Sequence, residues 1–494
     1  MTSWPSFLAL LALFALVHTP IVRGADRPGE MDAETARILE QGNASGAGVG
    51  TNPASVTAPV SAEPVNLSID WDHPLFKTAR EAYSLNAFRN FGNEVPANPE
   101  YQKNISYINP GMLRYHNSGM VGDSQKAAGW IKSETHAWDV DKIKAVTANW
   151  PKGPAVQITI PRWPDWMSSS PEKLLDEQNY EAYATLCADL VRIINLELKL
   201  GVKKWEPMNE RELVYIRALE KAGKKEQYSK LITIFNLCAK KMKAVDPTIQ
   251  VGGPAVASAG WTEVVTRFAE GTRGNLDFFS CHLYAGNDAA ASDEHIFNTA
   301  VSFGPTLAAV SKILKKKTGR EIEISLNEFN INYTFKTADK RMTNHKGAVF
   351  DALVMISVLS NGCTSTCAWN DADHVYGKMS NKFVLRPSAH LYHLLNTYFV
   401  GDVVTTVSSD KTRIVPFAVF DEKSGRKSIL LVNRSGAPQS VNLTITGVLA
   451  PTGLSRHEIS EAGYTELPFE SKALNAPLTL PACSVTVIAA PIGS

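Results

Sequence analysis

The sequence lacks several features that mark particular classes of protein. Its 494 residues hold 50 lysines and arginines against 49 aspartates and glutamates, so no excess charge favours binding to nucleic acid or to an anionic membrane. No internal repeat occurs at the periods typical of solenoids. No segment reaches the roughly 20 consecutive apolar residues that a membrane-spanning helix needs. What remains is a globular protein of two or three domains, whose 44% hydrophobic residues suffice for a large core.

Cysteine is also scarce, and its placement argues against a disulfide-rich protein and against a zinc-binding protein. Most of the six cysteines lie in otherwise apolar helix and strand patterns, and none stands with histidine at zinc-binding spacing. Cys363 and Cys367 lie on one predicted strand, where four residues place them about 13 Å apart, beyond disulfide reach. We predict buried free thiols, no disulfide framework, no metal and no cofactor.

The first 64 residues differ from the rest in composition. Residues 7–17 form an uncharged apolar run of eleven, followed by small residues around position 24. This pattern predicts a cleaved signal peptide over residues 1–24 and a secreted or periplasmic protein, free of the membrane after cleavage. An uncleaved anchor stays open as an alternative, because residues 1–6 carry no basic residue. Residues 25–64, rich in Gly, Ser, Pro and Thr, predict a disordered linker.

Strands and helices then alternate up to about residue 400. The eight predicted barrel strands are 84–91, 112–116, 155–160, 204–210, 249–253, 276–284, 321–328 and 364–370. Apolar residues recur every three or four positions over 180–198 and 228–242, as in amphipathic helices. Eight such units predict an α/β fold, a (β/α)8 TIM barrel over residues 65–400. The unit after the first strand is the weakest, since residues 92–109 show little helical periodicity.

The helical period disappears after residue 401. Short strands are predicted at 413–420, 427–433, 441–445 and 484–488, separated by Gly and Pro. They predict a C-terminal β-sandwich over residues 401–494. An isolated alternating strand at 65–71 is a further candidate for that sandwich.

Two glutamates end strands of the predicted barrel. Asn209-Glu210 closes the fourth strand and Asn327-Glu328 the seventh. Active sites of such barrels lie at the C-terminal ends of the strands, so both carboxyls should reach the same rim. A carboxyl pair is what glycoside hydrolysis requires, and a small barrel can hold the two groups about 5–5.5 Å apart, as in retaining enzymes.

These motifs resemble those of the clan A glycoside hydrolases, and most closely family 39, which contains β-xylosidases and α-L-iduronidases. Further segments of the resemblance are 114–116, 160–163, 252–254 and 277–284. It covers roughly residues 80–400, and a sandwich after the barrel also matches the family. The chain departs from the clan pattern at Arg211, where proline often follows the glutamate, and at Asn327.

The resemblance implies a retaining glycosidase acting on an oligo- or polysaccharide. Glu210 would be the acid/base and Glu328 the nucleophile, with Asn209 on the sugar's 2-hydroxyl. Tyr284 shares a strand face with His282 and would donate to Glu328. The remaining predicted sugar contacts are Arg114, His116, His282, Trp163 and Trp369. An ion pair for Arg114 and a structural role for either histidine are equally open, and a tryptophan taken singly is more often a core residue than a sugar platform.

Two other functions stay open at this stage. A metal-dependent barrel hydrolase would need several carboxylates or histidines converging on the rim, and Asp371 and Asp373 are candidates. A catalytically inactive carbohydrate-binding barrel protein would keep the fold without the reaction. Whether the enzyme acts on chain ends or within chains depends on loop shape.

Overall fold

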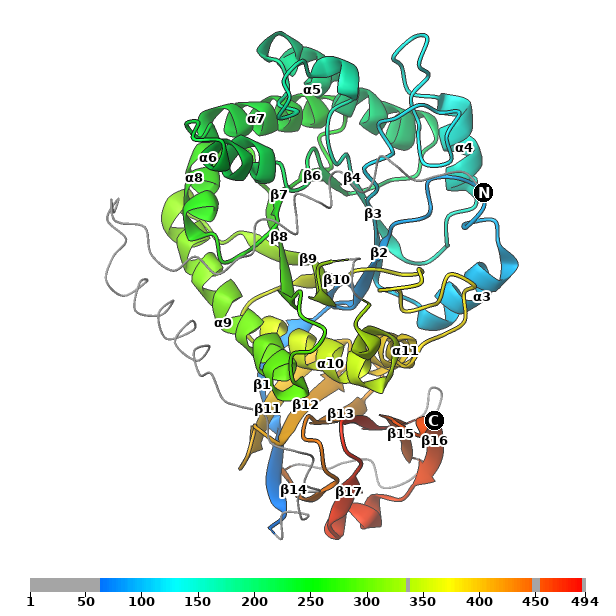
Figure 1. Cartoon of the computed structure of the whole chain (residues 1–494). Helices are drawn as coiled ribbons and strands as arrows, with labels where there is room; N and C mark the ends of the chain where they lie inside the picture. Colours follow the sequence, from blue (N-terminus) through cyan, green and yellow to red (C-terminus); the bar gives the residue numbers. More distant parts are fainter. Residues whose placement is uncertain (1–62, 335–337, 447–453, 491–494) are drawn as a thin grey trace.

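A computed structural model describes residues 63–334, 338–446 and 454–490. The predicted signal peptide, and all of the predicted linker except residues 63 and 64, lie outside the described residues. Figure 1 shows a ring of strands surrounded by helices, with a second β-rich body beside it.

The ring is a parallel barrel. Its strands pair in the order β6-β5-β4-β3-β2-β10-β9-β8-β7, and β6 and β7 are two parts of one interrupted strand. The strands are β2 (Ser84–Ala87), β3 (Met112–Tyr115), β4 (Ala155–Thr159), β5 (Lys204–Glu206), β6 (Gln250–Val251), β7 (Gly253–Val256), β8 (Phe278–Gly286), β9 (Glu323–Asn332) and β10 (Ser365–Ala368). The predicted (β/α)8 barrel is confirmed.

The interruption between β6 and β7 has a steric cause. A Cβ at Gly252 would lie 2.4 Å from the ring of Phe278, so only glycine fits against the neighbouring strand. Gly253 follows with a φ of 155°, a conformation that other residues rarely adopt. The prediction of one continuous strand over 249–253 is therefore corrected to two short segments.

Helices surround the barrel. They are α3 (Pro99–Ile108), α4 (Val140–Ala148), α5 (Tyr180–Val191), α6 (Leu219–Lys221), α7 (Tyr228–Val245), α8 (Thr262–Thr272), α9 (Asp293–Thr318), α10 (His345–Leu359) and α11 (Pro387–Tyr398), with π-helical turns at Arg192–Glu197 and Leu213–Ala218. Among the described residues no helix combines the length and the apolar character needed to cross a membrane.

The first helix, α3, forms where periodicity predicted it least. Asn98 caps its first turn, since its side chain accepts from the backbone N–H groups of Glu100 and Tyr101, and Pro99 stands at the first position. Asn109 ends the helix in the left-handed conformation, with a φ of 49°. Local capping thus offsets a weak apolar stripe.

The second body is a nine-stranded sheet with its own hydrophobic core. Its strands are β1 (Val65–Thr78), β11 (Gly401–Ser408), β12 (Ile414–Asp421), β13 (Arg426–Asn433), β14 (Gln439–Thr446), β15 (Leu454–Ser460), β16 (Gly463–Phe469), β17 (Leu478–Leu480) and β18 (Ser484–Ala489). Strand β1 lies between β11, to which it is antiparallel, and β14, to which it is parallel. The chain therefore passes through this sheet both before and after the barrel.

All six cysteines are buried and carry free thiols. Helix α10 is buried on most of its circumference, because it packs against the barrel strands and also against β13, β15 and β18. It joins the two bodies.

Candidate active site

Glu210 is positioned by the backbone that follows β5. Its N–H donates to the carbonyl oxygen of Ala255 at 3.0 Å, and the N–H of Asn209 donates to Pro161 at 3.0 Å. Glu210 itself has a φ of 52°, in the left-handed region. Neighbouring strand ends thus hold a sharp turn that directs its side chain toward the barrel axis.

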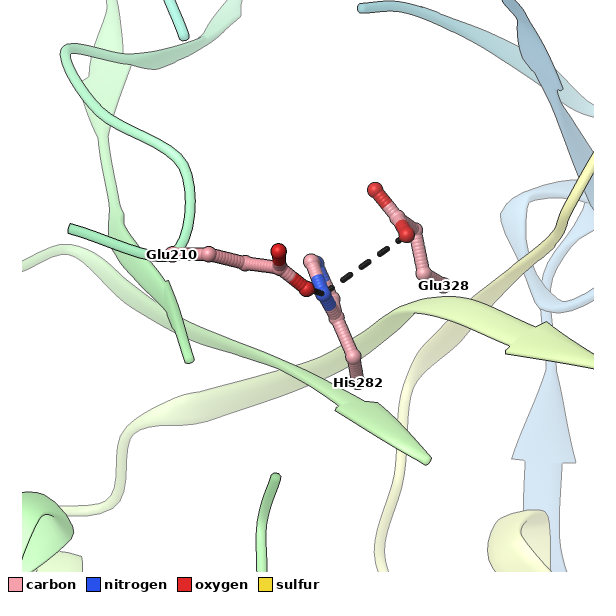
Figure 2. Close-up of side chains that lie close together, drawn as sticks. All are labelled: Glu210, His282 and Glu328. Atoms are coloured by element: carbon pink, nitrogen blue, oxygen red, sulfur yellow. Dashed lines mark hydrogen bonds and ion pairs between the residues drawn. The ribbon is translucent and has the colours of Figure 1, made fainter. Parts of the chain in front are cut away.

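The two predicted catalytic carboxyls meet. Figure 2 shows Glu210 from the β5 end and Glu328 from β9 directed toward each other, with His282 of β8 between them. One side-chain oxygen of each glutamate and one ring nitrogen of His282 all lie within 4.8 Å of one another. Such a separation fits a retaining pair at about 5–5.5 Å, and it is too short for an inverting pair at about 6.5–9.5 Å.

Glu210 has the surroundings of a carboxylic acid. Burial raises its pKa to about 8, against weaker opposing effects of the charges on Arg211 and Arg114. Its Oε1 lies 2.7 Å from Nδ1 of His282. Burial also lowers the pKa of His282 to about 4, so near neutral pH a protonated carboxyl and a neutral imidazole share this hydrogen bond.

Glu328 has stronger donors around it. Arg114 Nη1 donates to Oε1 at 3.0 Å, and the Tyr284 hydroxyl donates to Oε2 at 3.0 Å. Burial raises the pKa of Glu328 above its usual value, and Arg114 and the Tyr284 hydroxyl limit that rise. Because only Glu328 accepts from a guanidinium and a phenol, it is the carboxyl that ionises first.

Arg114 does not face a sugar site. It is 0% exposed, and each of its three nitrogens already has a partner. Nε donates to Glu206 at 2.9 Å, Nη1 to Asn86 at 2.9 Å as well as to Glu328, and Nη2 to Asn209 at 2.7 Å. The prediction of a sugar contact is corrected, because the side chain is enclosed by the barrel strands and binds other protein groups.

The other predicted contacts lie beside the carboxyls. His116 places Nδ1 3.6 Å from Oε1 of Glu328, and burial lowers its pKa well below the usual range. Asn209 uses its side-chain oxygen to accept from Arg114, which leaves its amide N–H groups to donate to a ligand. The ring of Trp369, which follows β10, lies 5.6 Å from that of His116 and 5.0 Å from that of Phe88.

Trp163 was also predicted to contact the sugar, and its surroundings contradict that prediction. It is only 2% exposed, and its indole N–H donates to the carbonyl of Lys173. Tyr183 and Tyr215 pack edge-on against its ring, and the guanidinium of Arg211 lies 5.5 Å from the ring centre. A tryptophan so enclosed belongs to the core and offers no face for a sugar ring to stack on.

Asp371 and Asp373 were the candidate ligands for a metal-dependent barrel hydrolase. Both instead stabilise loops through hydrogen bonds. Asp371 accepts from Asn90 and Tyr101. Asp373 accepts from three successive backbone N–H groups at residues 375–377. Within the described residues, the group able to hold a metal ion is instead Glu210, His282 and Glu328.

Sequence reasoning missed Asn86, Glu206 and Asn327 as members of the site. Asn86 and Glu206 both accept from Arg114, and Asn327 donates to Glu206 at 2.7 Å. The available signal was a polar residue inside each apolar strand, which is costly to bury without a partner.

Comparisons with known proteins agree with this geometry. Residues 171–385, which include both glutamates, match the family model described as glycosyl hydrolases family 39. A β-xylosidase of Caldicellulosiruptor saccharolyticus is 24% identical over 280 residues, 53% of this chain. The chain spans about half of that relative, 55% of its length.

Solved structures show the same fold at lower identity. A family 39 β-xylosidase from Caulobacter crescentus is 16% identical with a TM-score of 0.60, over 86% of this chain and 100% of that one. A family 51 α-L-arabinofuranosidase from Thermotoga petrophila is 14% identical with a TM-score of 0.64, over the same shares. These structures share the fold of this chain, and residues 171–385 of its barrel are similar to glycosyl hydrolases family 39.

Proposed function

We propose that this protein hydrolyses O-glycosidic bonds with retention of configuration, using Glu210 as acid/base and Glu328 as nucleophile. The observation that carries the proposal is the approach of these two carboxyls to within 4.8 Å in unlike surroundings. Burial raises the pKa of Glu210, which favours its protonated form, whereas Glu328 accepts hydrogen bonds from Arg114 and Tyr284. A protonated acid beside an ionised carboxylate is the starting state of double displacement.

In the first step the Glu328 carboxylate attacks the anomeric carbon as the bond to the leaving oxygen breaks. Glu210 gives its proton to that oxygen, so the leaving alcohol departs neutral. The product is a glycosyl ester on Glu328. Asn209, whose amide N–H groups are oriented by Arg114, donates to the 2-hydroxyl of the sugar as the transition state forms.

In the second step the Glu210 carboxylate takes a proton from water. The water oxygen attacks the anomeric carbon, the ester bond to Glu328 breaks, and Glu210 regains its proton. Two inversions at one carbon retain its configuration. Neutral His282, hydrogen-bonded to Glu210, holds the carboxyl in place through both steps.

For the substrate we propose a β-xyloside or a related glycoside within an oligo- or polysaccharide. The support is the β-xylosidase among the relatives and the match to family 39. Trp369, which lies beside His116 close to Glu328, is the aromatic side chain that we assign to the sugar face.

A 2-deoxy-2-fluoro-xyloside with a dinitrophenyl leaving group tests this function. The fluorine slows both steps and the good leaving group restores the first, so the ester on Glu328 accumulates. We expect one label per chain, located at Glu328 by peptide mass spectrometry, and none on Glu328→Gln. Sugar binding without any label in the wild-type protein would identify a binding protein instead.

Azide rescue distinguishes the two roles. In Glu210→Gln azide replaces water in the second step, so an activated substrate should give a glycosyl azide of retained configuration. In a variant that lacks the nucleophile, Glu328→Gly, azide attacks directly and the product is inverted. A loss of activity in chelator, with neither azide product, would support the metal-dependent alternative.

We further propose that the protein is exported. The support is the uncharged apolar run over residues 7–17 and the small residues near position 24. Expression of the full chain in a secreting host should give a product that begins near residue 25, as measured by N-terminal sequencing. A product that keeps residues 1–24 and sediments with membranes would indicate an anchor.

A further inference from the structure

Glu206 is a buried carboxylate that the proposed reaction does not use. It ends β5, four residues before Glu210, and is 0% exposed. Its Oε2 accepts from Arg114 Nε at 2.9 Å and from the Thr159 hydroxyl at 2.6 Å. Its Oε1 accepts from the Asn327 amide at 2.7 Å. One carboxylate thus binds side chains of β3, β4 and β9.

These contacts keep Glu206 charged. Burial by itself raises the pKa of a carboxyl, but the charge of Arg114 and the hydrogen bonds to Glu206 hold its pKa below the usual value. A charged group that is fully enclosed is expensive unless it is paired and hydrogen-bonded. A barrel that needed only packing at this position would hold an apolar residue.

The geometry shows what the charge does. Glu206 holds Arg114 by its Nε, and this leaves Nη1 to reach Glu328 and Nη2 to reach Asn209. It also holds Asn327, the residue next to Glu328 on β9. The nucleophile and the proposed ligand of the 2-hydroxyl are therefore both oriented through side chains that Glu206 fixes.

We propose that Glu206 is a positioning residue, which orients Glu328 and Asn209 through Arg114 and limits how strongly Arg114 attracts negative charge. Its kinetic consequences rest on the proposed glycosidase function. The Arg114 guanidinium lies between two carboxylates and is shared by them, so removing one leaves its full charge to the other. The ionisable groups that face Glu328 are Arg114, His116, Glu210, His282, Tyr284 and Tyr376.

The informative variant is Glu206→Gln, which has the same shape without the charge. Its side-chain oxygen can still accept from Arg114, and a half-turn of the Asn327 amide presents an oxygen to the new amide nitrogen. With the negative charge removed, the pKa values of Glu328 and Glu210 should both fall. Both limbs of the pH profile of kcat/KM should therefore move to lower pH, by about half a unit or more, with kcat/KM down about tenfold or more.

A second variant separates charge from geometry. Glu206→Asp keeps the charge but is one methylene shorter, so it should lower kcat while both limbs stay near their wild-type positions. A purely structural Glu206 predicts the opposite pattern in Glu206→Gln, namely a lower Tm with unmoved limbs, and that result would overturn the proposal.

The matched control is Glu323→Gln. Glu323 begins β9 and pairs with Lys204, which begins β5, so this ion pair joins the same two strands at the other end of the barrel. The Glu323→Gln substitution removes one negative charge, as Glu206→Gln does, but at the opposite end of these strands from Glu210 and Glu328. We expect its pH limbs to match those of the wild-type protein.

A readout without turnover keeps this inference distinct from the proposed function. Carbon-13 NMR of labelled glutamate carboxyls, assigned by difference against Glu210→Gln and Glu328→Gln, follows both titrations directly. Lower titration midpoints in Glu206→Gln support the positioning role even if no glycoside is hydrolysed. Unchanged midpoints reject it even if the wild-type protein proves to be a xylosidase.

Discussion

At the scale of single residues, the site is built from one acid pair whose members differ in their donors. Glu210 contacts a neutral imidazole, whereas Glu328 accepts from a guanidinium and a phenol. The chemistry therefore depends on burial and on a few hydrogen bonds, and single substitutions test each contribution.

Glu210→Gln should change the pH dependence of stability. The folded pKa of Glu210, about 8, lies above the unfolded value near 4.3, so its favourable contribution is complete below about pH 4 and is lost as pH rises through 8. A glutamine never ionises. Relative to wild type, the variant should gain Tm from pH 5 to pH 9, by about 2 °C or more in scanning calorimetry. A difference that stays constant with pH would contradict the raised pKa.

Tyr284→Phe should weaken the nucleophile. Without the hydroxyl the pKa of Glu328 rises, so the acidic limb of the kcat/KM profile on an aryl xyloside moves to higher pH. A hydrogen bond to a charged group contributes about 1.5–3 kcal/mol, which corresponds to a loss of roughly tenfold or more in kcat. Tyr392→Phe, in a buried tyrosine of α11, is the control and should leave the limb in place.

The sequence predicted part of this site. Glu210 and Glu328 could be found because strand ends of a barrel converge on one rim, and Tyr284 because spacing of two puts it on the face of His282. The roles of Arg114 and Trp163 could not be found that way. Whether a long side chain contacts a ligand or other protein groups depends on how far the neighbouring strands bury it. The sequence pattern alone does not give that burial.

At the scale of elements, helix α9 packs closely against α10 at one glycine. A Cβ at Gly304 would lie 2.4 Å from the backbone oxygen of Ser357, and the Gly304 N–H donates to the Ser357 hydroxyl at 3.2 Å. The two helices can approach this closely only without a side chain there.

Gly304→Ala should therefore destabilise the protein, although alanine favours helix by about 1 kcal/mol. The clash is with backbone, so α9 and α10 must separate, at a net cost of about 1–3 kcal/mol in the free energy of unfolding by urea. Gly274→Ala is the control, because a Cβ there meets nothing within 4 Å. Equal stability of the two variants would show that the helices separate without cost.

Element prediction succeeded where an apolar run or an apolar periodicity marks a buried element, and it failed elsewhere. The eight barrel strands were predicted because their apolar runs stand between turns. Helix α3 depends on its Asn98 cap, and strands β16 and β17 were missed because β16 is largely exposed and β17 has only three residues. Strand β11 was also missed, and most of its residues are half-buried. β15 was missed for a different reason, since its polar His457 and Ser455 are buried.

At the scale of the whole molecule, the second body is built from two segments, namely β1 before the barrel and β11 to β18 after it. Its apolar residues Val65, Leu67 and Ile69 are buried in the core of the second body, and the strand itself lies between β11 and β14. The predicted boundary at residue 401 divides the chain by sequence, whereas the sheet also includes residues 65–78.

Residues 401–494 expressed alone should not fold. Without β1, strands β11 and β14 each lose a neighbour and their apolar face is exposed. We expect no cooperative thermal transition by circular dichroism, and recovery of one when a peptide of residues 63–78 is added. A cooperative transition of the fragment by itself would contradict this dependence.

The order of these strands in the sequence also affects how the protein folds during translation. Val65 pairs with Val441, 376 positions later, so at about 5–20 residues per second β1 waits roughly 20–75 s for that neighbour during translation. Throughout that interval an apolar strand with open edges precedes a growing barrel. We expect nascent chains stalled before residue 401 to be captured by holding chaperones through residues 65–78, and cross-linking of stalled ribosome complexes can detect that capture.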